Sequence, residues 1–154
     1  MRKRLIPPTA ATKTRGWLDL EHVAVVEVTS EHKDFPVELA FASEDARGWR
    51  SAVPGSQTIR LIFDRPQRLR CVSLIFEEDE AERTQEFVLR WSSDGGSSPQ
   101  EIVRQQWNFS PHASIREVEE YQVDLHNVNV LELIIKPDIG GGSAHASLKN
   151  FRLA

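Results

Sequence analysis

The densest group of residues that could do chemistry is an acidic run, EEDEAE, at positions 77–82. A glycosidase needs two carboxyl groups about 5–9.5 Å apart across a cleft, and a run within one loop does not create that geometry. Carboxylates also bind hard cations, but the spacing of an EF-hand calcium loop is absent. We therefore expect a solvated loop between two strands at these positions.

The other residue types that catalyse reactions or bind metals are scattered along the chain. The five histidines show neither His-x-His nor His-Glu-x-x-His spacing, and a single cysteine cannot build a thiolate zinc site. Cys71 occupies an alternating strand position, which favours a buried, inert thiol. No Gly-x-Ser-x-Gly elbow is present, and the glycines at 140–142 lack the Lys-Ser/Thr of a phosphate-binding loop. We expect no enzyme activity, no metal site and no cofactor; a structural calcium ion stays open, although no motif indicates one.

Trp49 and Arg50 form the first candidate binding pair, at the end of the polar stretch 44–50. An apolar face of a sugar can lie on the indole ring while charged neighbours bind the hydroxyl groups. The alternative for Trp49 is packing at the end of the fold. We take both residues as candidate ligand-binding residues.

The polar connection at residues 108–116 supplies the second candidate group, Asn108, His112 and Arg116. An amide, an imidazole and a guanidinium together offer donors and acceptors for vicinal hydroxyls. Binding residues concentrate on loops held by a rigid scaffold, with an ordinary solvated loop as the alternative. These three residues complete the candidate ligand-binding set.

The elements that must position these residues are short strands with period-two alternation. Eight are predicted, at residues 22–30, 57–64, 68–77, 85–93, 101–109, 119–125, 129–136 and 146–153. The sequence SSDGGSSP at 92–99 predicts a hairpin, and residues 36–43 predict one short helical turn. Trp91 and Trp107 each share a face with apolar neighbours, so we expect both to pack in the core.

Composition limits the classes of function. The chain has 154 residues, 19 Lys and Arg against 23 Asp and Glu, and a net charge of −4. This balance gives no support for nucleic-acid or anionic-membrane binding. One cysteine excludes a disulfide scaffold, and the apolar stretch before Pro7 is too short for a signal peptide. We expect a flexible arm at residues 1–16, one domain at 17–154, a cytoplasmic location and a monomer.

Several segments resemble discoidin-like (factor 5/8 type C) domains of the galactose-binding domain-like superfamily. They are HKDFPVELAF at 32–41, GWRS at 48–51, GSQTIRLIFDRP at 55–66, LRCVSL at 69–74, SSDG at 92–95, VLELII at 130–135 and ASLKNFRL at 146–153. The resemblance covers roughly residues 22–154 but lacks the paired terminal cysteines of secreted members. It implies an all-β jelly-roll sandwich of about eight antiparallel strands, whose loops at one end bind a ligand.

Two hypotheses of function follow. The resemblance favours a non-catalytic module that binds a carbohydrate through the loops at one end of the sandwich. The alternative is an intracellular module that binds a protein partner through the same loops, which the lone cysteine and the missing signal favour. Because one fold hosts many functions, the resemblance alone does not choose between them.

Overall fold

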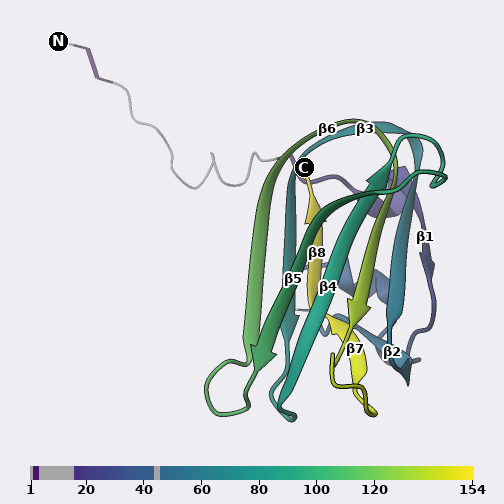
Figure 1. The fold of residues 1–154 in the computed structure, drawn as a ribbon. Helices are drawn as coiled ribbons and strands as arrows, with labels where there is room; N and C mark the ends of the chain where they lie inside the picture. Colours follow the sequence, from purple (N-terminus) through teal and green to yellow (C-terminus); the bar gives the residue numbers. More distant parts are fainter. Residues whose placement is uncertain (1, 4–15, 44–45) are drawn as a thin grey trace.

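Two facing layers of antiparallel strands make up the fold (Figure 1). The computed structural model describes residues 2–3, 16–43 and 46–154. The strands are β1 (Ala24–Val28), β2 (Trp49–Pro54), β3 (Gln57–Glu77), β4 (Arg83–Ser92), β5 (Gln100–Phe109), β6 (Arg116–Lys136), β7 (His145–Leu148) and β8 (Asn150–Leu153). Two short helices, α2 (Leu20–Val23) and η1 (Val37–Ala40), accompany them. The all-β, jelly-roll class predicted from the sequence is confirmed.

The two long strands β3 and β6 belong to both layers because each bends over one end of the molecule (Figure 1). In the front sheet, the order is β1, the first half of β3, the second half of β6, β4 and β5. The back sheet pairs β8 with the second half of β3, and that half with the first half of β6. The register slips between Ile62 and Gln67, a stretch that includes Pro66, which has no backbone N–H for the ladder. On β6, Asn127 at the bend has a left-handed φ of 57°.

Large apolar side chains fill the space between the layers. Phe76 of the back sheet stacks on Phe87 of the front sheet, with ring centroids 5.2 Å apart. Both rings are fully buried, as are Phe109 and Leu133. Burying one such side chain stabilises the fold by about 1.5–3 kcal/mol. Trp91 and Trp107 pack against this core, as predicted.

The strand predictions need three corrections. The predicted strands 57–64 and 68–77 are one continuous strand, and so are 119–125 and 129–136, because the chain stays paired through both bends. The predicted strand 146–153 is two strands, β7 and β8, which pair with different partners. Strand β2 was missed, because its residues have no clear alternation. The hairpin at 92–99 and the short helical turn at 37–40 are confirmed.

The N-terminal part of the domain is attached to its last strand. The Leu18 backbone N–H donates to the Leu153 carbonyl at 2.7 Å, and the Arg152 guanidinium lies 5.9 Å from the Trp17 ring centroid. Most of the arm predicted at residues 1–16 lies outside the described residues. Among the described residues, none of the helices has the length and apolar character needed to cross a membrane.

Candidate functional site

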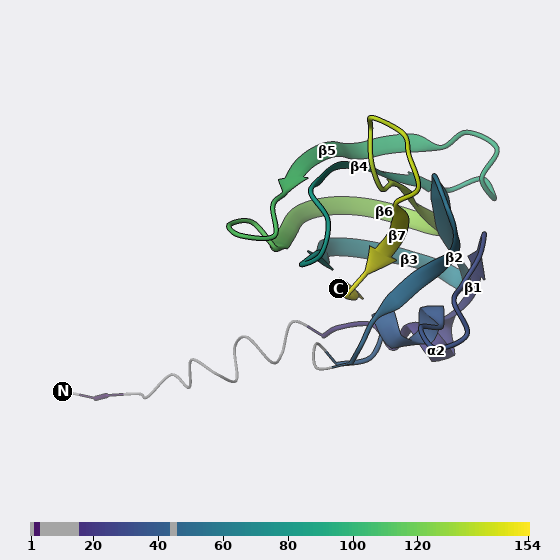
Figure 2. The same ribbon diagram turned by 90° about the horizontal axis from the view of Figure 1, so that it is seen from below.

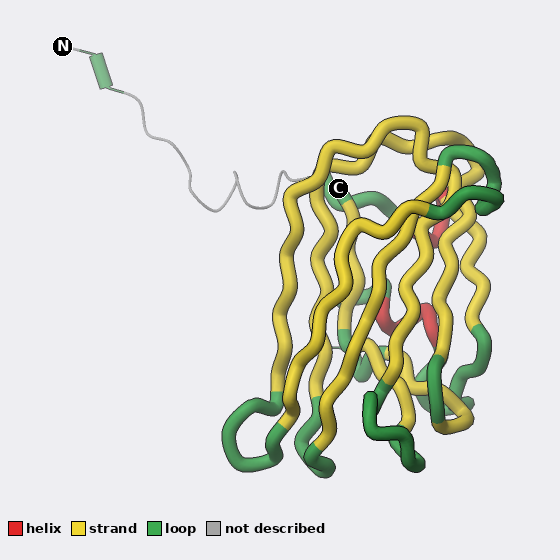
Figure 3. Tube along the Cα trace, in the orientation of Figure 1, coloured by secondary structure: helices red, strands yellow, loops and turns green. Residues whose placement is uncertain are grey.

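Loops gather at the end of the sandwich opposite the bends of β3 and β6 (Figure 3). We call this the loop end; among the described residues it comprises 29–43, 46–48, 78–82, 110–115 and 137–144, with β2 and β7 lying across it (Figure 2). Backbone hydrogen bonds join neighbouring loops: Glu78 N–H donates to the Ile115 carbonyl at 2.8 Å, and Gly55 N–H to the Ala144 carbonyl at 3.2 Å. The loops are therefore held at fixed positions by the scaffold.

The larger hollow at the loop end has a volume of about 550 Å³, and we call it the acidic hollow. Five carboxylates line it: Glu77, Glu78, Glu80, Glu82 and Asp138. Only two guanidiniums, those of Arg50 and Arg83, oppose them, together with His32 and His145. Its field therefore favours neutral or cationic groups over anionic ones.

A second hollow of about 420 Å³ adjoins the first, and we call it the basic hollow. Four cationic side chains line it: Arg47, Arg50, Arg116 and Lys149. Opposite them are Glu77, Glu78 and Asp79. Arg50, Glu77 and Glu78 line both hollows, so one ligand can contact the acidic and the basic hollow at the same time.

The Phe35 ring supports two arginines of the basic hollow, Arg47 and Arg50. The guanidinium of Arg50 lies 4.9 Å from the centroid of the Phe35 ring, and that of Arg47 lies 5.2 Å from it. The Arg50 N–H donates to the Phe35 carbonyl at 3.2 Å, and the Arg50 carbonyl accepts from His32 N–H at 2.8 Å. A stacked guanidinium keeps in-plane N–H donors available, which suits it to bind hydroxyls or carboxylates.

A buried arginine anchors the floor of the acidic hollow. Arg83 donates to the Glu78 carboxylate at 2.7 Å and to the Pro137 carbonyl at 2.8 Å, and it lies over the Phe109 ring. Burial of Glu78 opposes its ionisation, but the Arg83 hydrogen bond and backbone N–H donors outweigh that and hold its pKa below the usual range. This pair ties the loop 78–82 to the start of β4.

Glu117 lies beside this anchor in a buried position. Burial, and then the neighbouring carboxylate of Glu119, raise the pKa of Glu117 to about 8. Its Oε1 accepts from Gln85 at 3.2 Å, whereas Oε2 forms no hydrogen bond with the described residues. The carboxyl group is therefore protonated near neutral pH.

The structure places Trp49 in the core. Its side chain is 1% exposed, and its indole N–H donates to the Ser30 carbonyl at 3.1 Å. Gly48 permits this, because a Cβ there would lie 2.6 Å from the Leu148 carbonyl and its φ is +77°. Trp49 forms part of the floor of the basic hollow but presents no open face on which a sugar ring could stack.

The other four predicted residues divide into two groups. Arg50 and Arg116 line the basic hollow together, as the hypothesis requires. Asn108 instead belongs to strand β5, where its Oδ1 accepts from the Thr84 hydroxyl at 2.7 Å. Neither Asn108 nor the exposed His112 lines either hollow.

Sequence reasoning missed several residues of the loop end. Phe35, Arg47 and Lys149 come from segments that are far apart in the chain, and only the fold brings them together. The sequence offered one signal, since Phe35 and Arg50 both fall in segments of the discoidin-like pattern. Among the described residues, no group of three or more His, Cys, Asp and Glu side chains is arranged to hold a metal ion.

Comparison with known proteins gives structural neighbours only. No protein-family model and no curated protein matches the sequence. A family 32 carbohydrate-binding module of Clostridium perfringens NanJ, in complex with galactose, has a TM-score of 0.65 and 10% identity over 89% of this chain and 96% of that one. Another C. perfringens family 32 module, in complex with GalNAc-β-1,3-galactose, has a TM-score of 0.65 and 17% identity, covering 89% and 98%.

A third neighbour is the family 32 module of AlyQ, in complex with 4,5-unsaturated mannuronic acid. Its TM-score is 0.62 at 12% identity, with 86% of this chain and 95% of that chain covered. The three complexes hold chemically different sugars on one scaffold. The chain therefore has the discoidin-like, galactose-binding-like β-sandwich fold of the family 32 carbohydrate-binding modules.

Proposed function

We propose that this protein is a non-catalytic carbohydrate-binding module whose loop end binds a glycan. The observation that carries the proposal is the pair of adjoining hollows at that end, which share Arg50. Guanidinium and carboxylate groups together donate to and accept from sugar hydroxyls. The structural neighbours that hold galactose and GalNAc-β-1,3-galactose support a sugar as the ligand class.

The loop end offers binding groups rather than a catalytic arrangement. Arg50 is the central residue, because it is exposed, stacked on Phe35 and common to both hollows. Glu78 is already committed to Arg83 at 2.7 Å, so it serves as an anchor. We include a monomeric, cytoplasmic protein in the proposal, on the grounds of the single cysteine and the ordinary composition.

An NMR titration of the whole chain with galactose and GalNAc-β-1,3-galactose tests the proposal. Millimolar sugar should shift amides at residues 32–50, 77–82 and 138–147. Arg50→Ala should weaken binding about tenfold, through loss of a charge-assisted hydrogen bond. Arg68→Ala is the matched control, because Arg68 is exposed and pairs with Asp124 away from both hollows. Equal effects of the two substitutions would contradict the proposal.

A protein ligand for the same loops is the second candidate. Ile115 and Ile139 are 45% and 42% exposed on two loops of this end, and exposed apolar side chains suit a protein interface. If no sugar in a broad panel shifts the loop-end amides, while Ile115→Asp and Ile139→Asp abolish binding to a purified partner, this candidate replaces the first.

A further inference from the structure

A third hollow lies on the outer face of the front sheet, away from the loop end. We call it the face pocket. Its volume is about 520 Å³, within the range of roughly 300–1,000 Å³ typical of ligand sites. It lies over β1, β3, β6 and β4, and the hairpin at 92–99 closes one side. Four rigid strands and one short hairpin therefore build it.

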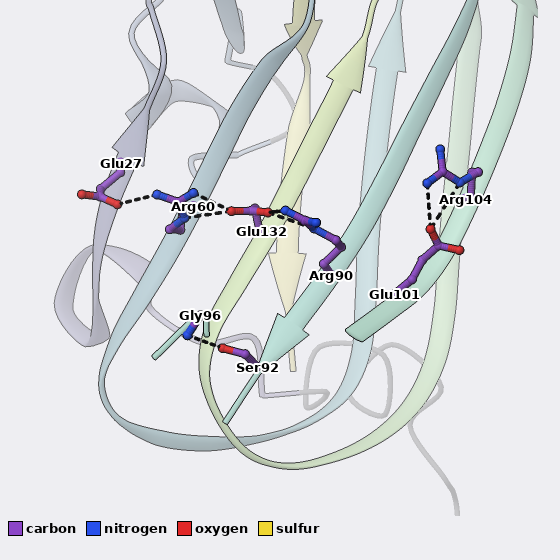
Figure 4. Close-up of polar contacts among 8 residues, drawn as sticks. All are labelled: Glu27, Arg60, Arg90, Ser92, Gly96, Glu101, Arg104 and Glu132. Carbon is purple, nitrogen blue, oxygen red and sulfur yellow. Dashed lines mark hydrogen bonds and ion pairs between the residues drawn. The ribbon is translucent and has the colours of Figure 1, made fainter. Parts of the chain in front are cut away.

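A row of alternating charges crosses the floor of the face pocket (Figure 4). Strand register places Glu27 opposite Arg60, Arg60 opposite Glu132 and Glu132 opposite Arg90. Arg60 donates to Glu27 at 3.1 Å and to Glu132 at 2.7 Å, and Arg90 donates to the other oxygen of Glu132 at 3.0 Å. Acceptors and donors thus alternate at the strand spacing of about 4.8 Å.

The centre of the row is fixed and its ends are open. Glu132 is 9% exposed; burial opposes its ionisation, but the hydrogen bonds from Arg90 and Arg60 hold its pKa below the usual range. Among the described residues, Glu27 Oε2 and Arg90 Nη1 form no hydrogen bond. Glu27 therefore keeps one acceptor, and Arg90 one donor, for a ligand.

The walls of the face pocket add apolar surface. Ile62, Val130, Trp91 and Pro99 line it beside the charged row. The hairpin is tied in place, because Gly96 N–H donates to the Ser92 hydroxyl at 2.7 Å and Gly95 N–H to Asn129 Oδ1 at 3.1 Å. Apolar walls with a few fixed polar groups are the usual composition of a small-molecule site.

We propose that the face pocket is a second ligand site, which binds a neutral saccharide through vicinal hydroxyl groups. Two carboxylates and two guanidiniums cancel in charge, so the pocket attracts neither anions nor cations at long range. A hydroxyl both donates and accepts, so a pair of them matches a row of alternating acceptors and donors. The site goes beyond the proposed function, because it uses a different face and none of the loop-end residues.

The same NMR titration tests the face pocket through the amides of the residues that line it. Galactose, N-acetylglucosamine and GalNAc-β-1,3-galactose should shift amides at residues 60–62, 90–99 and 129–132. Glu27→Ala should weaken this second binding event about tenfold and leave the loop-end shifts unchanged. Asp124→Ala is the matched control, because Asp124 is an exposed carboxylate like Glu27, pairs with Arg68 and lies outside the lining.

A second variant keeps the test independent of folding defects. Arg90→Lys retains the charge beside Glu132 but loses the planar guanidinium, so it should also weaken binding at the face. Shifts confined to the loop end would overturn the face pocket and leave the proposed function standing. Shifts confined to the face would support the face pocket and contradict the proposed function of the loop end. Equal effects of Glu27→Ala and Asp124→Ala, or a preference of the face for galacturonic acid over galactose, would also overturn this inference.

Discussion

The loop end and the outer face carry hollows of similar size on different kinds of framework. The acidic hollow measures about 550 Å³ and the face pocket about 520 Å³. At the face, strand register pairs each charge with an opposite one, and the charges cancel. At the loop end, charges separate into an acidic and a basic hollow that meet at Arg50. The comparison shows that groups paired by strand register cancel in charge on the face, while the loop end keeps an electrostatic field that can select a ligand by its charge.

Burial differs between the two regions in a related way. The basic hollow at the loop end rests on a buried apolar residue, Trp49, whereas the row on the face centres on a buried charge, Glu132. A buried apolar group stabilises the fold by itself, but a buried charge does so only with its partners present. Substitutions at these two positions therefore test the comparison most directly.

The largest effect is expected at Trp49. Trp49→Ala should lower the free energy of unfolding by about 3–5 kcal/mol, because it leaves a cavity beneath the loop end. Trp49→Phe should lower the free energy of unfolding much less, and it should preserve sugar binding at the loop end. Urea denaturation followed by circular dichroism measures both. If Trp49→Ala were as stable as the parent protein and lost only sugar binding, the ring would be a binding platform after all.

The next effect is expected at the centre of the charged row. Glu132→Gln should lower the free energy of unfolding by about 2–3 kcal/mol, because two guanidiniums lose their shared carboxylate. Glu101→Gln removes the same charge from an exposed pair and should change stability little. Equal losses in the two variants would show that burial of Glu132 contributes nothing, and the contrast between paired face and open loops would weaken.

Sequence patterns predicted the strands better than the site, for a physical reason. Alternation is local, so β4, β5 and the hairpin at 92–99 could be identified from a few neighbouring residues. The bends of β3 and β6 stay paired because strands distant in sequence lie beside them, and no local pattern carries that information.

The candidate site depends on such distant contacts throughout. Arg50 and Arg116 were predicted from their side-chain chemistry, and the fold brings them to one hollow. Trp49 was a candidate because its neighbours at 44–50 are polar, with packing at the end of the fold as the alternative; the structure shows the alternative, with the indole N–H hydrogen-bonded to Ser30 and the ring in the core. The row from Glu27 to Arg90 needs the register of four strands, which the residue types alone did not give.

A pH-dependent effect is expected from the buried carboxyl of Glu117. Its pKa is about 8 in the folded protein against an ordinary value of 4.5, so the folded state keeps a proton that the unfolded state releases. Stability should therefore fall as the pH rises from about 4.5 to about 8. Glu117→Gln imitates the protonated form and should remove this fall, which makes the variant more stable than the parent protein at the upper end of the range.

Denaturation across that pH range, with the exposed Glu82→Gln as the charge control, measures the effect. The groups that face Glu117 are Glu119, Gln85 and Arg83. An unchanged pH profile in Glu117→Gln would show that this carboxyl is ionised in the folded state. A second buried charge would then lie beside Arg83 at the loop end, and the contrast with the buried charge of the face would weaken.

The smallest effect is expected in the choice between neutral and anionic sugars. Glu80→Gln combined with Glu82→Gln removes two exposed charges from the acidic hollow. The double variant should raise loop-end affinity for galacturonic acid, relative to galactose, by about two- to threefold at low salt, because exposed charges act weakly and through a screened field. The gain should shrink as salt is added, and binding at the face pocket should not change. Isothermal titration calorimetry at two salt concentrations measures the affinities, and NMR shifts assign each binding event to the loop end or the face pocket. An equal gain in affinity for galacturonic acid at the face pocket and at the loop end would show that the acidic hollow and the face pocket do not differ in how they select a ligand by charge.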